Sequence, residues 1–167
     1  MHLDIKKFTS SAFIDKRGYY WTSWKKGQIK RIKFKHDKFS LSKKNVLRGL
    51  HGDSKTWKLV SCPYGKFLLV VVNYKKKSKD FLKWHSWILS QKNRLQILIP
   101  PNYANGHLCL SKECLFHYKL SYKGVYVDKN KQFSLRWNDP KLKIKWRIKK
   151  PVLSKRDKNS KLIKLEK

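Results

Sequence analysis

Acidic residues and cysteine are scarce in this sequence of 167 residues. It has 10 Asp plus Glu against 42 Lys plus Arg, a formal net charge of +32, and only three cysteines. Cys62, Cys109 and Cys114 are irregularly spaced, which is a poor disulfide framework, and the lack of a C-x-x-C pair gives no support for that type of zinc site. Cys109 and Cys114 lie near His107 and His117 and could be read as a metal cluster. All four are in apolar, strand-like surroundings, so we expect no metal.

Long apolar runs are missing as well. No run approaches the roughly 18 residues that a membrane span requires, and residues 1–4 do not begin an apolar signal segment. We therefore expect a reducing, cytoplasmic setting and no membrane. The length fits one domain by the usual size of about 100–200 residues. The prediction is a single domain over 1–167, with a core at about 12–150 and a basic C-terminal tail at 151–167.

The excess of positive charge is compatible with two kinds of partner. Clustered cations neutralise phosphates, which is typical of nucleic-acid binding. Scattered lysine is equally compatible with a small anionic substrate, such as a nucleoside diphosphate, while the remaining lysines are solvated. Because most of the lysines here are scattered, the small substrate is favoured and nucleic acid stays the alternative. The 40% apolar and 14% aromatic content is enough to build a core.

Short β-prone runs separated by turn signals make up most of the chain. The expected strands lie at 1–14, 19–24, 29–35, 46–47, 59–60, 67–74, 84–89, 95–99, 108–110, 115–120, 133–137 and 142–148. The run at 67–74 is continuously apolar and predicts a strand buried on both faces. Residues 100–106 are expected to form a rigid loop, and Leu162, Ile163 and Leu165 either pack as a short element or fray. This pattern predicts an all-β sandwich, jelly roll or barrel.

One stretch concentrates ionisable groups between strands. It reads Val-Leu-Arg-Gly-Leu-His-Gly-Asp over residues 46–53, with Lys58 following. The unperturbed pKa of histidine, about 6.5, suits His51 to act as a general base. Glycine lets the backbone approach a ligand closely, and Arg48 and Lys58 suit a phosphate or a developing oxyanion. A structural turn with solvated charges would have the same composition.

Further landmarks accompany this stretch in a fixed order. They are Asp15-x-Arg17-Gly18-x-Tyr20, Asp37-x-x-Ser40-x-Ser42, Asn45 to His51, Lys58-Leu59-Val60, Pro100-Pro101-x-x-Ala104-x-Gly106, Tyr118-Lys119, Trp137-Asn138-Asp139-Pro140 and Leu153 to Asp157. Together they resemble the dTDP-4-dehydrorhamnose 3,5-epimerase family. The resemblance implies a cupin-like jelly-roll barrel, a homodimer, and no metal or organic cofactor. It also implies that a proton is removed beside the C4 ketone of a nucleoside-diphosphate 4-keto-6-deoxy sugar and returned on the opposite face.

The resemblance assigns roles to particular residues. His51 would be the base, Asp157 would orient its ring, and Tyr118 would be the acid on the opposite face. Lys58 and Arg48 would stabilise the enolate or hold the phosphates. This chemistry suits a carbon acid beside a ketone, which needs a base, an acid and cations at the forming oxyanion.

The nucleotide side of the resemblance is less regular. Arg17 and Tyr122 match positions that contact the nucleotide, Tyr122 by stacking on the base. Asn105 stands where the family usually has histidine, and His36 and Lys38 replace the Gln and Asn that flank Asp37. His107 follows Gly106 and is expected on the opposite face of a strand. Thr22 and Gln132 each replace a glutamate, and His85 and His117 match no motif.

These departures predict retained epimerase chemistry on an altered sugar or base. The substrate would be a dTDP- or GDP-linked 4-keto sugar of surface polysaccharide biosynthesis, inverted at C3, C5 or both. The residues at 51–60 resemble variants acting on other nucleotide-linked keto sugars, such as GDP-linked heptoses. Two alternatives remain open: a 3,4-ketoisomerase on the same fold, and a non-catalytic basic barrel that binds nucleic acid or an acidic polymer.

Overall fold

The computed structural model describes residues 5–164. Its strands are β1 (Lys6–Thr9), β2 (Ala12–Asp15), β3 (Gly18–Trp21), β4 (His36–Lys43), β5 (Leu47–Gly52), β6 (Trp57–Tyr64), β7 (Lys66–Asn73), β8 (Trp84–Ser90), β9 (Leu95–Ile99), β10 (Tyr103–Cys109), β11 (Glu113–Ser121) and β12 (Phe133–Ser134). Two short helices accompany them, η1 (Lys129–Lys131) and α1 (Lys155–Lys158). None of the helices in the described part of the chain is long and apolar enough to cross a bilayer.

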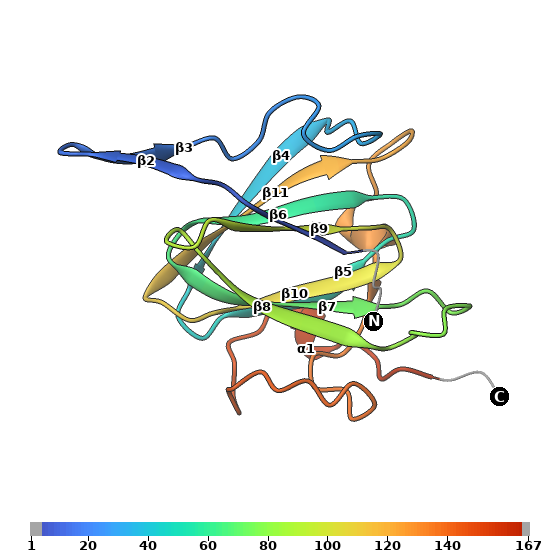
Figure 1. The fold of residues 1–167 in the computed structure, drawn as a ribbon. Coiled ribbons are helices and arrows are strands. Elements are labelled where there is room, and N and C mark those ends of the chain that lie inside the picture. The colour runs from blue at the N-terminus through green and yellow to red at the C-terminus, as the bar shows by residue number, and fades with distance from the viewer. Residues whose placement is uncertain (1–4, 165–167) are drawn as a thin grey trace.

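The strands form two antiparallel five-stranded sheets that face each other as a jelly roll (Figure 1). The first sheet has the order β1-β9-β6-β11-β4, and the second has the order β12-β5-β10-β7-β8. Strands β2 and β3 form a separate hairpin that stands out to one side of the barrel. The cupin-like all-β fold expected from the sequence is therefore confirmed.

Strand β7 of the second sheet is buried on both of its faces. Leu69 and Val71 point into the core between the sheets, whereas Leu68 and Val70 belong to a second apolar cluster behind β7. The C-terminal segment closes that second cluster with its buried side chains Leu135, Leu142, Trp146 and Ile163. Alternate residues of β7 thus enter different cores, which explains the continuous apolar run and confirms that prediction.

The expected strand at 29–35 is wrong. This segment is a turn followed by irregular chain, and Arg31 adopts a positive φ of 65°. Its apolar side chains still pack on the outer face of the first sheet, where Ile29, Ile32 and Phe34 lie with Leu59 and Leu98. The mixture of apolar and basic residues therefore reports which side chains are buried. It does not report strand pairing, because the loop lies across the sheet face rather than beside a strand edge.

Other strand boundaries also differ from expectation. The region 1–14 contains two strands, β1 paired with β9 and β2 paired with β3, and its first four residues lie outside the described part. The expected loop at 100–106 ends early, since β10 starts at Tyr103. The expected strand at 133–137 is a strand only over its first two residues, as β12. Residues 142–148 form no strand, although Leu142 and Trp146 are buried there.

The C-terminal segment is fastened to the barrel. Val152 forms a parallel bridge with Val46 just before β5, and Ser154 caps α1 by accepting a hydrogen bond from the Asp157 N–H at 3.1 Å. Ile163 is 4% exposed and packs with the cluster behind the second sheet. The expected packing of this region is therefore observed at Ile163, while Leu165 lies outside the described residues. This anchoring brings Asp157 alongside β5.

Candidate active site

A cavity of about 460 Å³ lies inside the jelly roll. It is lined from both sheets and from the C-terminal segment by Ser40, Arg48, His51, Lys58, Asn105, His107, Phe116, Tyr118, Tyr126, Lys129, Gln132, Ser154, Arg156 and Asp157. Six of the residues predicted from the sequence are in this set: His51, Tyr118, Asp157, Arg48, Lys58 and Asn105. Residues that are more than a hundred positions apart in sequence therefore meet in one place.

A bulge in β5 places Arg48 and His51 on the same side. In the pairing with β10, His107 lies opposite Arg48 and Asn105 lies opposite His51, so three steps on β5 match two on β10. An extra residue of this kind shifts the alternation of side chains by one position. Leu50 consequently turns into the cluster behind the sheet, while both ionisable groups face the cavity.

Gly49 makes the close approach of β5 and β10 possible. Its φ is 126°, and a Cβ atom at this position would lie 2.4 Å from the Cα of Gly106 and 2.8 Å from the carbonyl oxygen of Asn105. Both the backbone conformation and the space therefore require glycine. The first glycine of the central motif is thus explained by packing between strands.

His51 and Asp157 form the shortest ionic contact of the cavity. His51 Nε2 lies 2.7 Å from Asp157 Oδ1, and Ser154 donates its hydroxyl to Asp157 Oδ2 at 2.8 Å. Burial acts to raise the pKa of Asp157, but hydrogen bonds from His51, Ser154 and the Gly49 N–H outweigh it and lower the pKa. Because the ionised carboxylate accepts only, Nε2 carries the proton and the lone pair of Nδ1 is available as a base.

Tyr118 lines the same cavity from β11. Burial raises its pKa to about 12, helped by Tyr126 and opposed by Arg48. The phenol therefore keeps its proton throughout the neutral and moderately alkaline range. A protonated phenol and the imidazole of His51 therefore line one cavity.

Lys58 is the buried cation of the site. It is 7% exposed, and its ammonium donates a hydrogen bond of 2.9 Å to Asn105 Oδ1. Burial lowers the pKa of Lys58 to about 8, with Asp53 acting to raise it and Arg156 to lower it. At neutral pH the side chain is therefore a protonated donor that faces the cavity, where it is well suited to a developing oxyanion.

Arg48 is held by a short chain of hydrogen bonds. Its Nε donates to Ser42 Oγ at 3.0 Å, and Ser42 Oγ lies 3.3 Å from His107 Nε2. Burial lowers the pKa of His107 to about 3, and the charge of Arg48 contributes, so the imidazole is neutral and accepts the serine proton. His107 lies two residues after Asn105 on β10 and lines the cavity with it. Its role here is to fix Arg48.

Four predicted binding residues lie away from the cavity lining. Arg17 is on the exposed hairpin, where it donates to Asp15 Oδ2 at 2.6 Å. His36 and Tyr122 contact each other at 3.0 Å between Nδ1 and the phenol oxygen. Lys38 Nζ lies 4.1 Å from the ring centroid of Tyr126.

Tyr126 itself is the aromatic residue of this group that lines the cavity. Sequence reasoning missed it, together with Ser40, Phe116, Lys129, Ser154 and Arg156. The segment after β11 is irregular, so counting from Tyr118 could not distinguish Tyr122 from Tyr126. Arg156 carried a usable signal, since it precedes Asp157 in the motif that was noticed.

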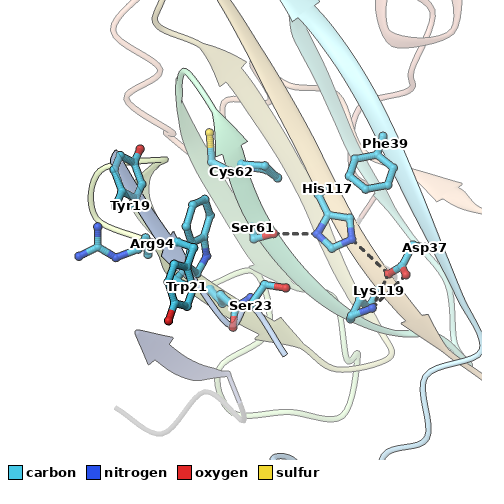
Figure 2. Close-up of a pocket in the computed structure, with 13 residues that line it drawn as sticks. Tyr19, Trp21, Ser23, Asp37, Phe39, Ser61, Cys62, Arg94, His117 and Lys119 are labelled. Atoms are coloured by element: carbon cyan, nitrogen blue, oxygen red, sulfur yellow. Dashed lines mark hydrogen bonds and ion pairs between the residues drawn. The ribbon is translucent and has the colours of Figure 1, made fainter. Parts of the chain in front are cut away.

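A second cavity of about 460 Å³ lies on the outer face of the first sheet, beneath the hairpin (Figure 2). It contains a chain in which Ser61 Oγ lies 2.8 Å from His117 Nδ1, and His117 Nε2 lies 3.1 Å from Asp37 Oδ1. Lys119 also donates to Asp37, at 2.9 Å. Among residues 5–164, no group of three or more His, Cys, Asp or Glu side chains is placed to hold a metal ion.

The fold and the site define a class of enzyme: a cupin-like jelly roll that removes and returns protons at a carbon atom. A sequence profile of the family described as dTDP-4-dehydrorhamnose 3,5-epimerase matches residues 3–164. The enzyme of that name from Salmonella typhimurium is 34% identical over 163 residues, which cover 92% of this chain and 87% of the relative.

Solved structures agree with the sequence relatives. A dTDP-6-deoxy-D-glucose-3,5-epimerase from Legionella pneumophila, in complex with dTDP-4-keto-L-rhamnose, is 34% identical with a TM-score of 0.88, covering 95% of this chain and 87% of its own. A dTDP-4-dehydrorhamnose 3,5-epimerase from Bacillus anthracis, with TDP and PPi bound, is 29% identical with a TM-score of 0.89, covering 96% and 94%. The chain belongs to the dTDP-4-dehydrorhamnose 3,5-epimerase family and is an isomerase of the epimerase type. The epimerase prediction is thereby confirmed over its two alternatives.

Proposed function

We propose that this enzyme inverts C3, C5 or both in a dTDP-linked 4-keto-6-deoxy sugar. The observation that carries the proposal is the convergence of the His51–Asp157 pair, Tyr118 and Lys58 on one cavity. The ligands of the Legionella and Bacillus relatives support a dTDP-type substrate. Three free, buried cysteines support a reducing compartment, and we propose the cytoplasm.

The proposed proton transfers use these residues in order. His51 Nδ1 takes the proton from the carbon beside the C4 ketone, the C–H electrons form a carbon–carbon double bond, and the carbonyl becomes an enolate. The Lys58 ammonium hydrogen-bonds the enolate oxygen, while Asp157 stabilises the imidazolium. Tyr118 then gives its proton to the opposite face of the same carbon, which restores the ketone. Exchange with water deprotonates His51 and reprotonates Tyr118.

The nucleotide is proposed to bind against Tyr126, Lys129 and Arg156, which line the cavity. Tyr126 supplies a flat aromatic ring, on which a base can stack. Lys129 and Arg156 supply cations for the diphosphate, and Arg156 is held by two hydrogen bonds to Ser134 Oγ at 2.9 and 3.1 Å. Tyr122, His36 and Lys38 are proposed to act through Tyr126, which they surround.

A thermal-shift experiment distinguishes the proposed nucleotide from the alternative. Saturating dTDP, at about a hundred times its dissociation constant, stabilises the native state by about 2.7 kcal/mol. For a chain of this size, this raises Tm by roughly 5–10 °C. GDP and pyrophosphate at the same concentration are expected to raise Tm less. A larger rise in Tm with GDP than with dTDP would contradict the proposal and indicate a GDP-linked sugar as the substrate.

We also propose a homodimer in which the β2–β3 hairpin of one copy reaches the other. The hairpin exposes Phe13, Ile14 and Tyr20 at 56%, 73% and 65%, and the outer face of the first sheet exposes Phe39 and Leu41 at 62% and 53%. Exposed apolar surface of this extent is typical of an interface. The hairpin stands away from its own barrel in Figure 1, so we assign Arg17 to the nucleotide of the second copy.

Mixing two inactive variants tests this arrangement. His51→Asn removes the base from the variant's own cavity, whereas Arg17→Ala weakens nucleotide binding in the cavity of the partner copy, so in a mixed dimer both changes fall in the same cavity. If the hairpin is exchanged, a mixed dimer contains one intact site, so activity is expected to return to roughly a quarter of the wild-type level, since about half of randomly mixed dimers are hybrid. Each variant remixed with itself is the control. A mixture no more active than the sum of its parts would place Arg17 outside the partner's site.

A further inference from the structure

Lys58 and Asn105 contact each other inside the cavity of the proposed active site. Lys58 projects from β6 in the first sheet, whereas Asn105 projects from β10 in the second. The 2.9 Å hydrogen bond from Lys58 Nζ to Asn105 Oδ1 therefore spans the barrel interior. Both side chains line the cavity that also holds His51 and Tyr118.

We propose that Asn105 is a positioning residue, which holds the ammonium of Lys58 at the place where the substrate enolate forms. This inference rests on the proposed function, since it presumes that Lys58 faces the reacting carbonyl. The amide is suited to the task because its oxygen accepts from the ammonium at every pH. An imidazole in its place would lose this acceptor when it became protonated.

The backbone around Asn105 supports such a role. Asn105 is paired with His51 across the bulge of β5, and its carbonyl oxygen lies against Gly49, where no Cβ could fit. The residue that holds Lys58 is therefore fixed relative to the residue that removes the proton. In the described part of the chain, Asn105 Nδ2 makes no hydrogen bond, so its two donors remain for the substrate.

Asn105 Oδ1 is the acceptor that contacts the ammonium of Lys58. Lys58 makes no direct ion pair within residues 5–164; burial lowers its pKa, the charge of Asp53 raises it and that of Arg156 lowers it, while a hydrogen bond to the ammonium favours the charged form. The charged and titratable groups that face it or share its cavity are Asp53, Arg156, Arg48, His51, His107, Tyr118, Tyr126, Lys129 and Asp157. Two of these are anions under neutral conditions, and Asp157 is engaged by His51.

Two variants of Asn105 are expected to move the pKa of Lys58 in opposite directions. Asn105→Leu removes the acceptor and should lower the Lys58 pKa by about one unit, whereas Asn105→Asp adds an anion and should raise it by about one unit or more. Asn105→His should leave the loss of kcat/KM at alkaline pH near that of the wild type. It should add a loss of activity below about pH 6.5, where imidazole takes up a proton.

The experiment measures the Lys58 pKa and the reaction separately. The first readout is an NMR titration of the enzyme with ¹³C-labelled lysine and no substrate, in which the Lys58 signal is identified by its loss in Lys58→Arg. The second is the pH dependence of kcat/KM for solvent deuterium entering dTDP-4-keto-6-deoxyglucose. Gln132→Leu removes another amide of the cavity that does not contact Lys58, and it should leave the Lys58 pKa unchanged.

The proposal is supported if the Lys58 pKa shifts in opposite directions in the Leu and Asp variants, and if the alkaline side of the kcat/KM profile shifts with it. An unchanged Lys58 pKa in both folded variants overturns it, even if deuterium exchange is normal. Shifts of the pKa without any deuterium exchange in the wild type instead overturn the proposed substrate and reaction, while leaving Asn105 as the residue that holds Lys58.

Discussion

Replacing His51 with asparagine is expected to lower the rate of epimer formation by about 10²–10⁴-fold, the usual contribution of a general base. Asparagine is shorter than histidine and loses the 2.7 Å contact of Nε2 with Asp157, but Asp157 keeps its hydrogen bond from Ser154, so the fold should be retained. The variant has no lone pair comparable to that of Nδ1. Entry of solvent deuterium into the sugar should therefore fall together with epimer formation.

The control for this variant is His85→Asn. His85 lies on β8 and is not among the residues that line the cavity. It should retain wild-type kcat, which would show that loss of an imidazole elsewhere in the barrel is harmless. Retention of deuterium exchange by the His51 variant, with an unchanged melting temperature, would contradict the assignment of His51 as the base.

The spacing of Arg48 and His51 shows what the sequence could and could not predict. Their chemistry was evident from residue type and order. On a regular strand, however, residues three positions apart point to opposite faces. They share the cavity because β5 is bulged where Gly49 meets β10, and such a bulge depends on pairing between strands that are more than fifty residues apart. Sequence periodicity alone contains no information about that register.

The irregular segments show the same limit for the fold. Residues 29–35 and 142–148 have apolar side chains that are buried or half-buried, yet neither segment is a strand. They cover the outer faces of the two sheets. Their apolar side chains therefore pack in apolar clusters although their backbones are not paired in a sheet. The sequence did not indicate that Tyr126 lines the cavity for a related reason, because the chain after β11 follows no regular period.

Tyr118→Phe is expected to separate proton exchange from inversion. The phenol is the proposed donor to the face opposite His51, and burial keeps its pKa at about 12, so it is protonated at any pH where the enzyme works. Without the hydroxyl, His51 still removes the proton and, after exchange with solvent, returns a deuteron to the face it came from. Deuterium should then appear in the unconverted sugar, while epimer formation falls by about 10²–10⁴-fold.

This outcome is distinctive because His51→Asn should suppress both events, and loss of fold would do the same. The measurement is NMR of the sugar in deuterated water, which reports label at C3 and C5 and configuration in one spectrum. Tyr64→Phe is the matched control, since Tyr64 is 55% exposed at the end of β6. If Tyr118 serves only one of the two carbons, inversion will persist at the other carbon, and the carbon that loses it identifies where the phenol acts. Equal loss of exchange and inversion at both carbons would instead show that Tyr118 is needed before the proton leaves.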